Sequence, residues 1–236
     1  MIISLAGLTV EVKNRYSYIE KLAADYAVCS DKIDFTVEAT DDDIEAEREM
    51  SEYEFGVGYL ESIAVYRKIA EKLPAYNAVV FHGAVIAEDG LAYAVTARSG
   101  VGKTTHLSLW KRAFGDKVYI LNGDKPILRV IDGTVYAAGT PWRGKEGYGI
   151  PGMLPLCAVG FLERSSEPSA VPISKDSALA RFASQIYIPS TPRAASLALC
   201  VLDRIISSVG LFEIRANMEL ASAHVSHNAF KNNKKA

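Results

Sequence analysis

The sequence predicts a mixed α/β fold of α+β character, with a largely antiparallel sheet, a glycine-containing loop after a β-hairpin, and a small α+β lobe in front. The dipeptide Asp89-Gly90 separates the apolar runs 78–87 and 91–96, which is a strong hairpin signal. The second run leads into a glycine-containing loop, and apolar residues then recur at helical spacing at Leu107, Trp110 and Phe114. The strand that enters the loop is therefore expected to be antiparallel to its predecessor, unlike the strands of all-parallel sheets.

The first 76 residues predict the small α+β lobe. Alternating apolar residues indicate strands at 2–5, 8–12 and 33–37, and helical spacing indicates a helix over 19–26. Thr40 precedes an acidic run and is expected to cap a helix whose first turn carries carboxylates that favour its dipole. A second helical stripe begins at Tyr59 and ends before Pro74. The predicted division is a lobe at 1–76, a main domain at 77–230 and a tail at 231–236 that should fray.

The main domain continues with a second hairpin around Asp132-Gly133 and a glycine-rich loop over 139–149. Beyond it the pattern predicts a buried strand at 156–161, a helix at 174–183, a long helix that Thr191-Pro192 opens and Gly210 closes, a strand at 211–214 and a helix at 219–228.

Composition restricts the class of protein. The chain has 236 residues, 49% of them hydrophobic, and a formal net charge of −2, so it can bury a core and offers no basic face for nucleic acid. The most apolar long stretch, 194–209, contains Asp203 and Arg204, and no signal peptide is evident, so we expect a cytoplasmic protein without a membrane partner. A homo-oligomer stays open. Three distant cysteines fit neither a disulfide framework nor a metal site, and are expected to be reduced and partly buried: Cys29, Cys157 and Cys200.

The loop between 96 and 103 has the composition of a phosphate-binding loop. Its glycines leave backbone N–H groups pointing inward, the following helix adds its positive dipole, and Lys103 adds a full charge. Ala97 stands where the first glycine of the usual motif would be, so the start of the loop must use ordinary backbone angles. We therefore predict ATP and Mg²⁺ as ligands, with the hydroxyl of Thr104 on the metal. The predicted nucleotide-binding residues are Ser99, Gly100, Val101, Gly102, Lys103, Thr104 and Thr105.

Four further residues are candidates for the chemistry. Asp124 follows the β-type run after the helix and could hold the metal or accept a proton, although it could also simply cap the turn at Asn122-Gly123. His82 lies one hairpin strand from the loop, where a histidine alone is more often structural. Arg143 and Lys145 occupy the glycine-rich loop; they could neutralise transition-state charge or bind an acidic acceptor, or lie on a solvated surface.

These residues together resemble a known family. Phe81-His82-Gly83, the hairpin, the run 99–104 and Asn122-Gly123-Asp124 are similar to the catalytic core of HPr kinase/phosphorylase and its shorter relatives, which share a nucleotide fold with ATP-dependent phosphoenolpyruvate carboxykinases. The similarity covers residues 78–138 and, more loosely, 139–149. It implies that His82 matches an active-site histidine, that Lys103 and Thr104 match phosphate and magnesium residues, and that Asp124 matches the first of two consecutive aspartates. Lys125 stands in place of the second.

The sequence thus favours an ATP- and Mg²⁺-dependent kinase that phosphorylates a hydroxyl, with serine of a peptide or small protein as the expected acceptor and Asp124 as general base. One alternative is a phosphoenolpyruvate carboxykinase-like enzyme. The other is a nucleotide-sensing binding protein without catalysis, which Ala97 and Lys125 suggest. The sequence names neither the acceptor nor the residues that recognise the base.

Overall fold

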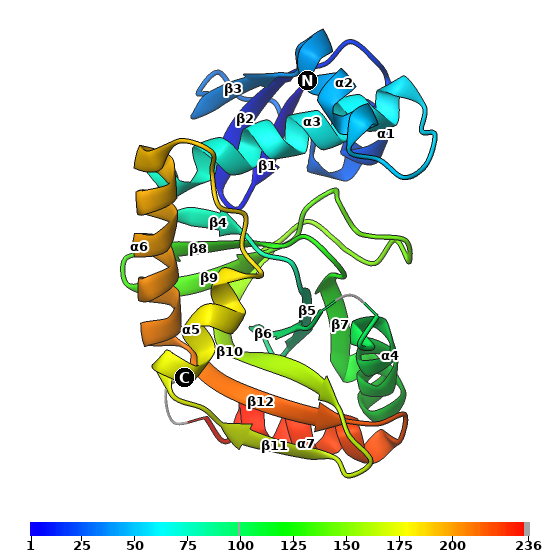
Figure 1. Cartoon of the computed structure of the whole chain (residues 1–236), viewed down its shortest axis with the longest axis vertical. Coiled ribbons are helices and arrows are strands. Elements are labelled where there is room, and N and C mark those ends of the chain that lie inside the picture. The colour runs from blue at the N-terminus through cyan, green and yellow to red at the C-terminus, as the bar shows by residue number, and fades with distance from the viewer. Residues whose placement is uncertain (99, 234–236) are drawn as a thin grey trace.

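A computed structural model of the chain describes residues 1–98 and 100–233. The fold is mixed α/β, with a three-stranded and a nine-stranded sheet and, among the described residues, seven α-helices. Figure 1 shows the small sheet and its helices at one end of the molecule and the large sheet below them. The fold class predicted from the sequence is confirmed.

The small lobe consists of β1 (Ile2–Leu5), β2 (Leu8–Lys13), α1 (Tyr18–Leu22), a 3₁₀ turn (Ala24–Tyr26), β3 (Phe35–Glu38), α2 (Asp41–Glu49) and α3 (Val57–Lys72). Strand β2 pairs antiparallel with β1 and parallel with β3. Thr40 caps α2 as predicted, because its side chain accepts from the amide of Asp43 at 3.2 Å and the Asp43 carboxylate accepts from the Thr40 amide in return. The lobe shares one hydrophobic core with Val80, Ile127 and Trp142 of the main domain. The domain boundary near residue 76 stays a prediction.

The large sheet has the strand order β4-β8-β9-β10-β6-β5-β7, and β12 adds to β10 with β11 outside it. The strands are β4 (Ala78–Val80), β5 (Ala84–Glu88), β6 (Leu91–Thr96), β7 (Val118–Asn122), β8 (Ile127–Ile131), β9 (Thr134–Ala138), β10 (Met153–Arg164), β11 (Ser169–Pro172) and β12 (Gly210–Ala216). Strand β10 is parallel to β6 and β12, and the other pairs are antiparallel. The predicted hairpin is present, so the loop after β6 follows a strand that is antiparallel to β5.

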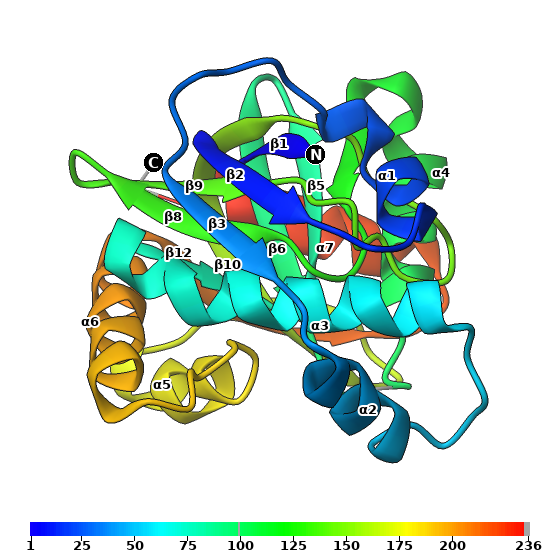
Figure 2. The same ribbon diagram turned by 90° about the horizontal axis from the view of Figure 1, so that it is seen from above.

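Helices cover both faces of this sheet. Alternate residues of β6 face opposite sides, so Ala92 and Ala94 pack in the core beneath α5 (Lys175–Ala183) and α6 (Pro192–Ser208). Tyr93 and Val95 instead pack against α4 (Lys103–Phe114) and α7 (Leu220–Lys231). Short 3₁₀ turns occupy Leu73–Tyr76 and Gly115–Lys117. Seen from above, α3 runs across the end of the large sheet, where the small lobe meets it (Figure 2).

The predicted run 78–87 is divided into two strands, which corrects the expectation of one continuous strand. Strand β4 pairs with β8, whereas β5 pairs with β6 and β7. Between them the amide of His82 donates to the carbonyl of Gln185 at 2.6 Å. An added Cβ on Gly83 would lie 2.3 Å from the Phe81 ring, so only glycine fits this crossing. The break places His82 where the two halves of the sheet separate.

Three smaller expectations were wrong. Gly210 does not close the long helix, because α6 ends at Ser208 and Gly210 is the first residue of β12. Cys157 is buried, but Cys29 and Cys200 are exposed. Lys231 belongs to α7 rather than to a frayed tail, because its ammonium group pairs with Glu88 at 2.8 Å. No helix of the described residues is long and apolar enough to cross a membrane.

Candidate functional site

The phosphate loop lies between β6 and α4 and has the backbone that its glycines predict. Gly100 and Gly102 have φ angles of +78° and +122°, a region that favours glycine. Ala97 is not among the described residues with positive φ, so the start of the loop uses ordinary angles as expected. The side chain of Lys103 folds back over the loop and donates to the carbonyl of Ala97 at 3.1 Å. Ser99, one of the predicted binding residues, lies outside the described residues.

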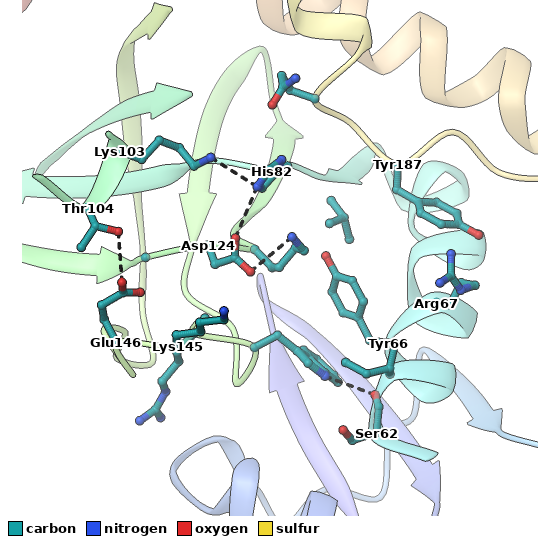
Figure 3. Close-up of a pocket in the computed structure, with 18 of the residues that line it drawn as sticks. Ser62, Tyr66, Arg67, His82, Lys103, Thr104, Asp124, Lys145, Glu146 and Tyr187 are labelled. Carbon is teal, nitrogen blue, oxygen red and sulfur yellow. Dashed lines mark hydrogen bonds and ion pairs between the residues drawn. The ribbon is translucent and has the colours of Figure 1, made fainter. Parts of the chain in front are cut away.

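A pocket of about 940 Å³ opens beside this loop. Figure 3 shows Lys103, His82 and Asp124 side by side within it. The Nζ atom of Lys103 lies 3.4 Å from Nε2 of His82, and the same Nε2 lies 3.5 Å from Oδ1 of Asp124. Lys125 closes the row, with its Nζ 3.2 Å from Oδ2 of Asp124. The row therefore alternates cation, imidazole, carboxylate and cation.

The surroundings keep His82 neutral. Burial lowers the pKa of His82 to about 4, and the charges of Lys125 and Lys103 act in the same direction against that of Asp124. A neutral imidazole can accept a hydrogen bond at Nε2 from Lys103, and an Nε2 that accepts does not also donate to Asp124. Burial also lowers the pKa of Lys103, an effect that Asp124 opposes.

A turn presents the Asp124 carboxylate to the pocket. The side chain of Asn122 accepts from the amides of Asp124 at 2.9 Å and Lys125 at 2.8 Å, and donates to the carbonyl of Thr140 at 3.1 Å. Asn122 therefore caps the turn, which leaves the carboxylate of Asp124 free of that role. The alternative in which Asp124 caps the turn is wrong. Gly144 allows the loop 139–149 to approach, since its own added Cβ would lie 3.0 Å from Cβ of Asp124.

The two cations of the loop 139–149 lie in different surroundings. Arg143 lines the pocket, but its guanidinium pairs with Asp25 at 2.9 Å and lies over the Tyr26 ring, 5.8 Å from its centroid. It therefore ties the loop to the small lobe. Lys145 also lines the pocket and has no ion-pair partner within residues 1–98 and 100–233.

Oxygen donors gather at the start of α4. The Thr104 hydroxyl donates to Oε1 of Glu146 at 3.3 Å, and both residues line the pocket with Asp124 (Figure 3). Hydroxyl and carboxylate oxygens suit Mg²⁺, which proteins commonly hold by one or two carboxylates together with phosphate oxygens. No group of three or more His, Cys, Asp or Glu side chains within the described ranges could hold a metal alone. The donor set fits a magnesium ion that is shared with a bound polyphosphate.

The remaining loop residues face other hollows. Lys103 and Thr104 line the central pocket, Val101 and Thr105 line a second hollow of about 650 Å³, and Gly100 and Gly102 line both. Val101 and Thr105 are therefore the described binding candidates that do not line the central pocket.

Sequence reasoning missed several side chains that support the site. The guanidinium of Arg164, at the end of β10, donates to the carbonyls of Gly100 and Val101. The Oε1 of Gln185 accepts from Thr96 at 3.0 Å, and the same threonine hydroxyl donates to the carbonyl of His82 at 2.7 Å. These contacts join residues far apart in the sequence, so no local motif could have revealed them.

Comparison with known protein families finds no match, and comparison with curated proteins finds none. Among solved structures, the chain is similar to the HPr(Ser) kinase/phosphatase from Coxiella burnetii, with 11% identity and a TM-score of 0.38 over 63% of this chain and 94% of that chain. A likeness of this size carries no argument about function. The functional argument therefore rests on the geometry of the site.

Proposed function

We propose that the protein is an ATP- and Mg²⁺-dependent kinase that transfers the γ-phosphate of ATP to a hydroxyl group, with serine of a peptide or small protein as acceptor. One observation carries the proposal: Lys103, at the start of the helix after the glycine-containing loop, and the carboxylate of Asp124 reach the same pocket with His82 between them. A phosphate at Lys103 would then lie beside a group able to accept a proton.

The proposed step needs few groups. The acceptor hydroxyl gives its proton to Asp124, its oxygen forms a bond to the γ-phosphorus, and the bond from that phosphorus to the β–γ bridging oxygen breaks, so that ADP leaves with the electron pair. Lys103 balances charge on the transferred group. His82 is neutral because of its lowered pKa, so it can hold the Lys103 ammonium group by accepting from it.

Thr104 and Asp124 are the proposed metal-holding residues, and Glu146 is the carboxylate that the geometry adds. When bound, Mg²⁺ would neutralise phosphate charge and orient the phosphate oxygens. Lys145 is proposed to add charge at the pocket. For Arg143 the ion pair with Asp25 supports a role in fixing the loop rather than in contacting phosphate.

The test is transfer of label from [γ-³²P]ATP to a library of serine-containing peptides, followed by mass spectrometry. We expect Lys103→Ala and Asp124→Asn to lower transfer by at least 100-fold, since each removes a charged group from the reacting centre. Lys117→Ala and Asp116→Asn are matched controls, because both residues are exposed and lie beyond α4. Undiminished transfer in either site variant would refute the assigned roles.

A second candidate is a nucleotide-sensing protein without catalysis. The observation that favours it is the contact between Lys125 and Asp124, because an ammonium group 3.2 Å from Oδ2 occupies a carboxylate oxygen that a proton-accepting base needs. Tight binding of Mg·ATP without transfer to any hydroxyl or to water would support this candidate against the kinase. The carboxykinase-like alternative is tested in the same series by oxaloacetate-dependent turnover.

A further inference from the structure

The wall of the pocket opposite the phosphate loop comes from the small lobe and holds an unsatisfied polar group. Tyr66 lies on α3 and is only 8% exposed. Its hydroxyl is buried and has no hydrogen-bond partner among the described residues. Figure 3 shows its ring pointing from α3 into the pocket on the side of Asp124. Burial raises the pKa of Tyr66 well above its usual value, and the charge of Asp124 adds to the effect. The group is a protonated donor that faces the reacting centre.

The neighbours of Tyr66 are satisfied by protein groups. Arg67 pairs with Glu47, with one contact at 3.0 Å, and the hydroxyl of Tyr187 donates to Glu71 at 2.9 Å. Trp142 packs against Tyr66 with ring centroids 4.7 Å apart and the ring planes tilted by 44°. Because a buried polar group without a partner is destabilising, a hydroxyl held in this way points to a ligand that completes it.

Four aromatic side chains, Tyr18, Tyr53, Phe55 and Tyr59, form a continuous strip from this pocket to the surface, which we call the aromatic strip. Tyr18 and Tyr59 line the pocket, with ring centroids 5.8 Å apart. Phe55 lies 4.6 Å from Tyr59, and Tyr53 lies 6.3 Å from Phe55, again between centroids. Tyr53 is 73% exposed and Phe55 40%. Exposed aromatic residues that continue a pocket mark a binding surface.

Specific contacts hold the inner end of the strip in place. An added Cβ on Gly58 would lie 2.9 Å from Cβ of Tyr18, so glycine lets α3 approach this segment closely. The carboxylate of Glu61 is fully buried and accepts from the amides of Arg15 at 2.6 Å and Tyr16 at 3.1 Å. The segment that carries Tyr18 is therefore fixed against α3.

Acidic residues precede and flank Tyr53 in the sequence, at the outer end of the strip. Of the acidic residues between 41 and 54, four are paired with neighbouring cations: Asp41, Asp43, Glu45 and Glu47. The other four, Asp42, Glu49, Glu52 and Glu54, are exposed and have no ion-pair partner in the described part of the chain, and Glu52 and Glu54 flank Tyr53 in the sequence. The strip therefore combines apolar rings with surplus carboxylates, a surface that favours an apolar segment carrying lysine or arginine.

We propose that the acceptor is a basic peptide segment that binds along the aromatic strip and delivers a serine hydroxyl to Asp124. Its apolar side chains lie on the rings, its cations lie beside Glu49, Glu52 and Glu54, and the Tyr66 hydroxyl donates to a peptide carbonyl near the serine. The proposal rests on the kinase function above and gives its acceptor a chemical class.

Peptide binding tests the proposal without relying on catalysis. The probes are three fluorescein-labelled 12-residue peptides with one central serine and flanking leucines: one with four lysines, one with the lysines changed to glutamate, and one with them changed to glutamine. Fluorescence anisotropy is measured with the full chain and its Lys103→Ala variant. We expect the lysine peptide to bind at least 10-fold more tightly than the others, about 1.4 kcal/mol. Equal affinities would overturn the proposal.

Variants of the strip assign the effect to residues. Two double variants should each weaken binding of the lysine peptide at least 10-fold. One reverses charge, Glu52→Lys with Glu54→Lys, and the other removes rings, Tyr53→Ser with Phe55→Ser. Asp31→Lys/Glu38→Lys makes the same charge change on exposed residues elsewhere in the lobe, and Tyr119→Ser removes a ring that is 39% exposed on β7; both should leave affinity unchanged. Loss of binding in the controls as well would overturn the assignment to the strip.

Tyr66→Phe separates a binding role from a structural one. Removal of an unsatisfied hydroxyl should leave the melting temperature unchanged or raised, yet lower kcat/KM for the lysine peptide about 10-fold while nucleotide affinity stays constant. An unchanged kcat/KM would refute the role of the hydroxyl.

The outcomes distinguish the two proposals. Transfer to N-acetylserine amide together with peptide affinities that ignore the strip would overturn the docking proposal and leave the kinase in place. Charge-selective peptide binding without transfer to any hydroxyl would support the docking surface and refute the kinase. A second copy of the chain could also occupy the strip, and sedimentation of wild type and the strip variants tests this. A dimer that the variants dissociate would make the strip an interface between copies and overturn the proposal.

Discussion

Acid should destabilise the fold through His106, one turn into the helix that carries Lys103. The imidazole is 1% exposed; its Nε2 accepts from the indole of Trp110 at 3.2 Å and lies 3.0 Å from the Ser226 hydroxyl. Its Nδ1 is buried with no partner among the described residues. Burial lowers the pKa of His106 from 6.5 to about 4. The folded protein therefore keeps this residue neutral at a pH where the unfolded chain protonates it.

The size of the effect follows from the shift. Each unit of pKa difference corresponds to about 1.4 kcal/mol, so a fall from 6.5 to about 4 corresponds to about 3 kcal/mol. The unfolded chain binds the proton more tightly than the folded protein does. The free energy of unfolding therefore keeps this contribution of about 3 kcal/mol above pH 6.5 and loses it as the pH falls from 6.5 to 4. The burial of the whole ring means that solvent screening does not reduce this figure.

Urea unfolding at pH 7.5, 6, 5 and 4 measures the effect in wild type and in His106→Gln. Between pH 7.5 and pH 4, the unfolding free energy of the variant should fall by about 3 kcal/mol less than that of wild type. This difference does not depend on the stability of the variant at pH 7.5. His224→Gln is the control, since that histidine is on the exposed side of α7, and it should follow wild type. Parallel pH profiles for wild type and His106→Gln would refute the reasoning.

Three further changes have defined outcomes. Lys125→Ala should raise the pKa of His82 from about 4, because Lys125 is the strongest of the charges that lower it; an unmoved imidazole resonance in an NMR titration would contradict this. Arg164→Ala should lower affinity for Mg·ATP about 10-fold by releasing two carbonyls of the phosphate loop, and calorimetry with unchanged affinity would exclude that support. Gly139→Ala should lower the melting temperature strongly, because its Cβ would lie 2.0 Å from a backbone carbonyl oxygen. Gly56→Ala is the control, because an added Cβ there meets open space. Similar melting temperatures for the two variants would be inconsistent with this packing.

Local chemistry made much of the fold predictable. The predicted N-termini of two helices, at Ser174 and Thr191, were confirmed. Each of these side chains accepts a hydrogen bond from an amide in the first turn, an interaction that needs only neighbouring residues. The hairpin at Asp89-Gly90 was confirmed for the same reason, since both residues have positive φ angles, +52° and +77°. Interactions between residues a few positions apart can therefore be predicted from the sequence alone.

Long-range pairing was the part that could not be predicted. The sequence indicated a strand at 156–161, but β10 extends over Met153–Arg164 and pairs first with β9 and then with β6 and β12. Nothing local marks that change of partners. The strand run 78–87 was divided for a related reason, because its break depends on contacts with Gln185, about a hundred positions away.

The same distinction applies to the site. The positions of Lys103 and Asp124 in one pocket follow from the strand–loop–helix–strand order, which a motif can encode. Tyr66 comes from a helix in a different lobe, and its approach to the pocket depends on how the lobes pack. The sequence predicted only a helix from Tyr59 to before Pro74, and that pattern gives no sign that the hydroxyl of Tyr66 would reach a pocket.

Lys125 is the residue that sets the kinase and the binding protein apart, and charge balance explains how it is compatible with catalysis. Without nucleotide, Lys103 and Lys125 surround one carboxylate, and Asp124 is the nearest anion available to Lys125. A bound polyphosphate carries several negative charges at the loop beside both lysines, so the attraction of each ammonium group to phosphate exceeds its attraction to a single carboxylate. Lys125 can then turn toward the phosphates and leave Asp124 to accept a proton. On the proposed kinase mechanism, Lys125 would therefore hold the carboxylate of Asp124 until a nucleotide is bound.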